Sequence, residues 1–138
     1  MAQLILGRRA LFAASASLGL LGACSTLSGR TGALRRDPFT LGVAAGDPAV
    51  DGFVIWTRLA PDPLAPAGGM DPVGVPVAWE VATDPAFREI VQFGDALARV
   101  QDAHSVHVEI AGLLPYRPYW YRFHAGGAVS EVGCARTL

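Results

Sequence analysis

The chain has 138 residues, of which 51% are hydrophobic and 17% are charged, and its net charge is −1 at pH 7. This composition supplies enough apolar side chains for one packed domain and too few charges for a disordered chain. All basic residues are arginines, and the acidic residues outnumber them. No basic face is implied, so nucleic acid is not a predicted partner.

Residues 1–23 resemble an export signal. Arg8 and Arg9 precede the apolar run 10–23, which is shorter than the roughly 20 residues that a membrane span needs. The twin arginine followed by Leu11 and Phe12 indicates a signal of the Tat type. The sequence therefore predicts an exported protein, in the periplasm or at the cell surface.

Cys24 ends the run Leu21-Gly22-Ala23-Cys24, which resembles a lipobox. In this interpretation Cys24 carries the lipid that anchors the mature chain to a membrane, and residues 24–37 form a flexible tether. The alternative is ordinary signal cleavage nearby, with Cys24 an incidental residue. Cys134 is the other cysteine, so no disulfide is predicted within the domain, and we interpret Cys134 as a buried or half-buried strand residue.

Residues 38–138 are predicted to form one all-β domain. Short apolar runs alternate with Asp-Pro pairs, Gly and Pro, which favour turns. About seven short strands at this spacing are typical of an immunoglobulin-like or fibronectin III-like antiparallel β-sandwich. The runs that we interpret as strands are 39–43, 52–59, 75–83, 105–110, 119–124 and 128–137, with two weaker ones at 89–93 and 96–100.

Four residues are predicted to have structural roles in this sandwich. Leu113, Pro115 and Tyr119 have the spacing of the corner between two strands at which a tyrosine hydroxyl bonds back to the backbone. Trp56 occupies the position of a core tryptophan on the second strand. Separately, a surface that binds a sugar, a peptide or another domain is a candidate role for Trp79, Trp120 and Arg122.

No catalytic, cofactor-binding or metal-binding residue is predicted in this chain. His104 and His107 are three apart in a strand and point to opposite faces, so we interpret them as a surface pair. His124 is predicted to point outward, with no partner evident. Asp47 and Asp51 lack the dense spacing of a calcium loop and are interpreted as turn formers. Nucleophile-elbow, Walker and zinc-protease motifs are absent from the sequence.

Several segments, taken in order, resemble the opening of the PhoD-like alkaline phosphatases, which are phosphodiesterases and phosphomonoesterases. The segments that carry the resemblance are FTLGVAAGDP at 39–48, VIWTRL at 54–59, WEVATD at 79–84, HSVHV at 104–108 and GLLPYRPYWYRF at 112–123. In that family this region is a non-catalytic N-terminal sandwich. It is followed by a larger metallophosphatase domain that holds iron and calcium and carries the hydrolysis.

Two hypotheses follow. In the first, the chain is the N-terminal domain of an exported PhoD-like phosphatase, and its partner is the catalytic domain of the same protein, which we expect to be missing from this sequence. The resemblance then implies iron and calcium in that domain and no cofactor here. In the second, the chain is a free-standing, fibronectin-like surface lipoprotein that binds a protein or a glycan.

Overall fold

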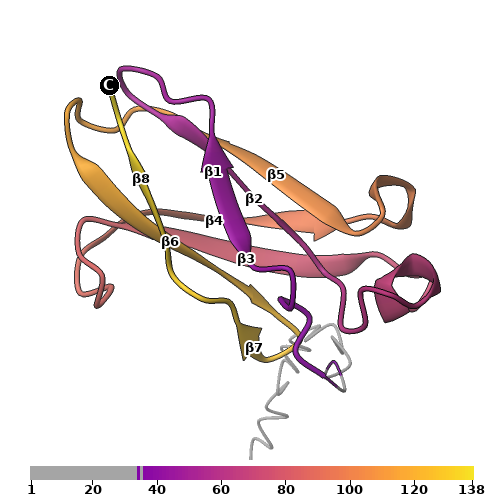
Figure 1. The fold of residues 1–138 in the computed structure, drawn as a ribbon. Coiled ribbons are helices and arrows are strands. Elements are labelled where there is room, and N and C mark those ends of the chain that lie inside the picture. Colours follow the sequence, from indigo (N-terminus) through magenta and orange to yellow (C-terminus); the bar gives the residue numbers. More distant parts are fainter. Residues whose placement is uncertain (1–33, 35) are drawn as a thin grey trace, which may run out of the picture.

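Two antiparallel sheets pack face to face in the computed structural model, which describes residue 34 and residues 36–138 (Figure 1). The smaller sheet has the strand order β1 (Val43–Gly46), β2 (Phe53–Arg58), β5 (Ser105–Ile110). The larger sheet has the order β4 (Ile90–Ala98), β3 (Val75–Ala82), β6 (Pro118–Ala125), and both β7 (Ala128–Val129) and β8 (Gly133–Arg136) pair with the free edge of β6. Two short 3-10 turns, Pro66–Gly69 and Val100–Asp102, lie in the connections.

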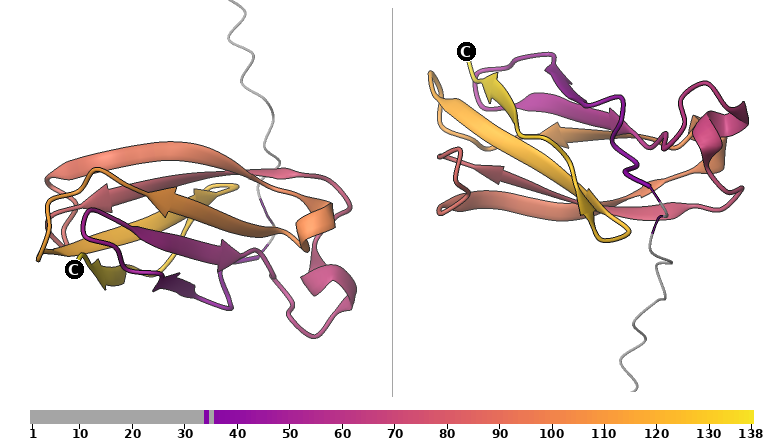
Figure 2. Two further views of the ribbon diagram at one scale, coloured as in Figure 1. Left: turned by 90° about the horizontal axis from the view of Figure 1, so that it is seen from above. Right: turned by 60° about the horizontal axis from the view of Figure 1, so that its bottom comes forward.

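The chain crosses between the sheets after β2, after β4 and after β5, so the strands form Greek-key connections (Figure 2). This arrangement confirms the prediction of an all-β, fibronectin III-like sandwich. No residue from 36 to 138 lies in an α-helix, and the described part of the chain holds no helix long and apolar enough to span a membrane.

The core lies between the sheets and follows from the two-residue period of the strands. On β3, Val77 and Val81 point inward and are fully buried, whereas Pro76, Ala78 and Glu80 between and beside them are more exposed. Val81 is paired with Tyr121 of β6, and Trp79 is paired with Phe123, so the inner faces of β3 and β6 match. Strands β3, β5 and β6 therefore lie where the alternating pattern predicted them.

The first predicted strand, 39–43, is wrong in its position. Phe39 is buried in a turn, and the N–H of Gly42 donates a hydrogen bond of 2.8 Å to the Phe39 carbonyl. Gly42 has a φ of 74°, which turns the chain before β1 begins at Val43. Phe39 thus reaches the core from a turn and not from a strand.

The two weak strands predicted at 89–93 and 96–100 are one continuous strand, β4. Gly94, in the gap between the two predicted strands, lies within β4 and opposite Trp79 on β3. A Cβ atom at Gly94 would lie 2.7 Å from Cζ2 of Trp79, so the absence of a side chain makes room for the indole. Gly94 therefore allows Trp79 of β3 to pack against β4, and β4 continues through it.

The last predicted strand, 128–137, is divided into β7 and β8. At the division, the Ser130 hydroxyl accepts the N–H of Phe123 at 2.9 Å and donates to the Glu131 carbonyl at 2.7 Å. A side chain thus takes over one hydrogen bond of the ladder between β6 and its neighbour, while the N–H of Ser130 still donates to the Phe123 carbonyl at 2.9 Å. Regular strand pairing resumes at Gly133.

Candidate functional site

The residues predicted for export and anchoring lie outside the described part of the chain. Arg8, Arg9 and Cys24 belong to residues 1–33, and the tether predicted at 24–37 lies mostly there as well. Their roles therefore stay predictions.

A tyrosine corner joins β5 to β6. The buried Tyr119 hydroxyl accepts the N–H of Leu114 at 3.0 Å and lies 3.3 Å from the Leu114 carbonyl, to which it donates. Leu113 is buried beneath this corner, and Pro115 is exposed on its outside. The Tyr119 ring packs against Phe53 of the other sheet, with 6.2 Å between the ring centroids. The corner thus fixes the path of the chain as it crosses from one sheet to the other.

We expect Tyr119→Phe to lower the free energy of unfolding by about 1 kcal/mol, because it removes both hydrogen bonds and leaves the ring in place. Urea denaturation at neutral pH measures the difference. Tyr116→Phe is the matched control, since Tyr116 is highly exposed and its loss of a hydroxyl should leave stability unchanged. Equal midpoints for the two variants would contradict a role for the Tyr119 hydroxyl.

The outer face of the larger sheet carries a charged cluster on β3 and β6. Nε of Arg122 donates to Oε2 of Glu80 at 2.7 Å, and Nε2 of His124 lies 3.2 Å from the same oxygen. The Arg122 guanidinium lies 4.0 Å from the centroid of the Phe87 ring, which folds back from the β3–β4 turn. His124 points outward as predicted, and its partner, which the sequence did not reveal, is Glu80.

The surface predicted from Trp79, Trp120 and Arg122 does not form. Trp79 lies on the inner face of β3, packed against the core, whereas Trp120 and Arg122 lie on the outer face of β6. The physical reason is the pairing of β3 with β6, which places Trp79 opposite the fully buried Phe123. Cys134 lies opposite Trp120 on β8 and is exposed, so its prediction as a buried or half-buried residue is also wrong.

Burial raises the pKa of Glu80, but its hydrogen bonds to Arg122 and His124 and their charges outweigh burial and bring this pKa below its ordinary value of 4.5. A carboxyl whose pKa is lower in the folded state stabilises the fold above its unfolded-state pKa. That contribution is lost as the pH falls through the folded-state pKa. Ionised Glu80 therefore contributes to stability at neutral pH and ceases to do so in acid.

We expect Glu80→Gln to lower stability by about 1 kcal/mol at pH 7, since the group is partly exposed and its ion pairs are only modestly favourable there. The difference from the parent chain should shrink as the pH is lowered below 4.5. Urea denaturation across a pH series measures it, with Glu109→Gln on the exposed face of β5 as the control. A deficit that stays constant down to the acid end would contradict the assignment to this ion pair.

Trp56 lies on the outer face of the smaller sheet, so its prediction as a core residue is wrong. Its side chain is 41% exposed and stacks on His107 of β5, with ring centroids 5.8 Å apart and an interplanar angle of 17°. The inward positions of β2 belong to Phe53, Ile55 and Thr57, and the strand period puts Trp56 on the other side. Trp56 and His107 form an exposed aromatic pair.

His104 is buried, in contrast to its prediction as a surface residue. Ala103 and His104 both have positive φ, which rotates the His104 ring inward before β5 begins. Nε2 lies 2.9 Å from the Val73 carbonyl and must carry the hydrogen, because a carbonyl only accepts. Nδ1 is buried without a hydrogen-bond partner among the described residues. His104 thus holds the loop before β3 against the turn before β5, which is a structural role.

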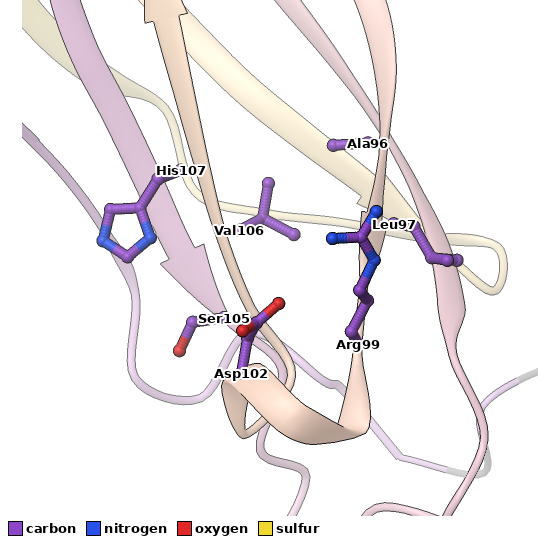
Figure 3. Close-up of a pocket in the computed structure, with 7 residues that line it drawn as sticks. All are labelled: Ala96, Leu97, Arg99, Asp102, Ser105, Val106 and His107. Atoms are coloured by element: carbon purple, nitrogen blue, oxygen red, sulfur yellow. The ribbon is translucent and has the colours of Figure 1, made fainter.

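A shallow cleft of about 520 Å³ lies where β4 ends and β5 begins (Figure 3). Its polar lining consists of Arg99, Asp102, Ser105 and His107, and its apolar lining of Ala96, Leu97 and Val106. Ser105 and His107 line this cleft together, and in residues 36–138 no hydrogen bond links them. Across the same residues, no group of three His, Cys, Asp or Glu side chains is placed to hold a metal ion.

The acidic residues at the β1–β2 hairpin form turns and bind backbone. Asp47 has a φ of 49°, and the Asp51 carboxylate accepts the N–H of Gly112 at 3.2 Å. The Asp51 carbonyl also accepts the N–H of Leu113 at 2.8 Å. These bonds join the hairpin to the tyrosine corner, in agreement with the interpretation of both residues as turn formers.

Comparisons with known proteins identify a family and a solved structure with the same fold. The family model of the PhoD-like phosphatase N-terminal domain matches residues 24–138. Alkaline phosphatase D of Bacillus subtilis (strain 168) is 57% identical over 101 residues, which are 73% of this chain and 17% of that protein. The solved structure of PhoD superposes with a TM-score of 0.74 at 55% identity, over 76% of this chain and 20% of that one. The chain therefore spans about a sixth of its curated relative, and it belongs to the family of PhoD-like phosphatase N-terminal domains.

Proposed function

We propose that this chain is the non-catalytic N-terminal domain of an exported PhoD-like alkaline phosphatase or phosphodiesterase. The hydrolysis of phosphate esters would be carried by a domain that follows it in the full-length protein. The observation that carries this proposal is the 57% identity to alkaline phosphatase D, which is confined to 17% of that protein. The remainder of such an enzyme has ample length for a catalytic domain.

The described residues do not fit the iron and calcium that the family implies. Metal-assisted hydrolysis of a phosphate ester requires several His, Asp, Asn or Cys ligands around the ion. The three histidines of the chain are separated in function: His104 holds a loop, His107 stacks on Trp56, and His124 contacts Glu80. We therefore assign the metals to the domain that follows, where they would act on the phosphate, and derive no catalytic step for this chain.

The role that we propose for the sandwich is to shape or shield the active site of that domain. A domain exchange tests it: residues 34–138 replace the matching segment of the Bacillus subtilis enzyme, next to a version from which the segment is deleted. We expect the chimera to hydrolyse p-nitrophenyl phosphate and the deletion to lose most activity. A folded but inactive chimera would count against the proposal and favour the free-standing, fibronectin-like surface lipoprotein that binds a protein or glycan.

We further propose export by the Tat route and a lipid on Cys24, which would place the domain in the periplasm or on the cell surface. The support is the sequence of the leader, with Arg8-Arg9 and the run that ends at Cys24. Replacing Arg8 and Arg9 by lysines should retain the precursor in the cytoplasm. Cys24→Ala should abolish the incorporation of labelled palmitate and leave export intact, and persistence of the label would contradict lipidation at this residue.

A further inference from the structure

One end of the sandwich bears an apolar patch formed by Val50, Leu114, Tyr116 and Leu138, which we call the end patch. Tyr116 is 76% exposed, and each of the other three is more than half exposed. They come from the β1–β2 hairpin, the corner between β5 and β6, and the segment that follows β8, which lie together at the end marked C (Figures 1 and 2). None of the four side chains is charged. Grouped exposed apolar side chains of this kind mark interaction sites.

The backbone beneath the end patch is fixed by hydrogen bonds between its three segments. The N–H of Leu138 donates to the Ala49 carbonyl at 2.8 Å, and the N–H of Tyr116 donates to the Leu138 carbonyl at 3.2 Å. These two bonds join the hairpin to the last residue, and the last residue to the corner.

The Thr137 side chain also fixes the backbone of the end patch. The buried Thr137 hydroxyl donates to the Leu114 carbonyl at 2.8 Å and accepts the N–H of Arg117 at 3.1 Å. Together with the Tyr119 corner, these bonds hold Leu114 and Tyr116 in place before any partner arrives. A preorganised surface loses less conformational entropy on binding than a mobile one.

The position of the end patch supports the choice of the following domain as its occupant. The family match extends to Leu138, and the chain covers only 17% of its curated relative. The matching family model is that of an N-terminal domain, so a further domain follows it in such a protein, and the C-terminal end of the match lies beside the patch. A partner tethered there has a high effective concentration at this surface.

We propose that the end patch docks the domain that follows Leu138 in the full-length protein, with Tyr116 as the central anchor; this inference rests on the function proposed above. The side chains fit an apolar partner surface, and an exposed tyrosine on a rigid backbone has the properties of an interface hot spot. The contact would hold the sandwich in one orientation relative to the active site.

The test uses the chimera with the Bacillus subtilis enzyme and the double variant Leu114→Ser/Tyr116→Ser. The matched control is Phe93→Ser/Leu97→Ser on β4, which removes two exposed apolar side chains outside the patch. We expect calorimetry to show one cooperative transition for the chimera and the control, and two separate transitions for the patch variant. Proteolysis at the junction after Leu138 should be about tenfold faster in the patch variant.

Each outcome separates the docking inference from the function proposed for the domain. In the isolated 138-residue chain, both double variants should unfold at the parent midpoint, because the side chains are exposed. An active chimera whose transitions and proteolysis do not respond to the patch variant would overturn the docking and leave the proposed function standing. A dimer of the isolated chain that the patch variant dissociates would also overturn it, because the occupant would then be a second copy.

Discussion

Gly52→Ala is expected to destabilise the domain by about 3 kcal/mol or more, because the added methyl group would collide with backbone. A Cβ atom at this position would overlap the carbonyl oxygen of Ile110, where the strands β2 and β5 come together. The neighbouring atoms belong to Ile110 and Ala111 backbone, which cannot rotate away as a side chain can. The whole β2–β5 ladder would have to shift.

Gly46→Ala is the matched control for this substitution. Gly46 lies on the other side of the same hairpin, and a Cβ atom there would meet no atom within 4 Å. Chemical denaturation followed by circular dichroism compares the two variants with the parent chain. We expect the Gly46 variant to match the parent within about 0.5 kcal/mol. Similar losses for the two variants would show that close approach of the strands is not the reason for glycine at position 52.

Phe123→Ala is expected to lower the free energy of unfolding by about 3–5 kcal/mol, as for other large-to-small substitutions of buried aromatic residues. Phe123 is fully buried and contacts Tyr121 edge to face, with 6.2 Å between the ring centroids. The lost stability has two parts: the free energy of transferring the ring from water to the core, and the cost of the cavity left between the sheets. Since small domains are stabilised by only about 5–15 kcal/mol, this variant is expected to be partly unfolded at 37 °C.

Phe93→Ala is the corresponding control on the outer face of β4, where the ring is 79% exposed. Thermal unfolding of both variants measures the contrast, and we expect the Phe93 variant to keep the parent midpoint. A large loss at Phe93 together with a small loss at Phe123 would reverse the inner and outer faces assigned to the larger sheet.

The fold could be predicted from the sequence wherever the apolar residues alternate strictly. The buried positions 77 and 81 on β3, and 119, 121 and 123 on β6, follow from that period alone. Boundaries were predicted less well because they depend on tertiary contacts. Position 94 in β4 is a glycine because the Trp79 indole occupies the space that a side chain would need. The residues around Gly94 give no sign of this contact, since Trp79 lies fifteen positions earlier.

The surroundings of the candidate site residues were harder to predict than the strands. The partner of His124 is Glu80, and their proximity requires that β3 pair with β6, which the sequence does not specify. His104 turns inward because two successive residues adopt positive φ, a conformation that is uncommon for non-glycine residues. The period of β2 did indicate that Trp56 shares a face with Val54, opposite to Phe53 and Ile55. The sequence of β2 alone does not tell which of these two faces packs against the other sheet.

We propose that this domain supports phosphate ester hydrolysis without performing it. The direct measurement is hydrolysis of p-nitrophenyl phosphate and its diester by the purified chain, with calcium and iron supplied, beside the chimera that carries the catalytic domain of the Bacillus subtilis enzyme. We predict turnover by the chimera and none above buffer by the chain alone, because the chain matches the N-terminal domain of the family and we assign the metal-dependent chemistry to the domain that follows. Metal-dependent turnover by the purified chain, retained after repeated chromatography, would contradict the claim.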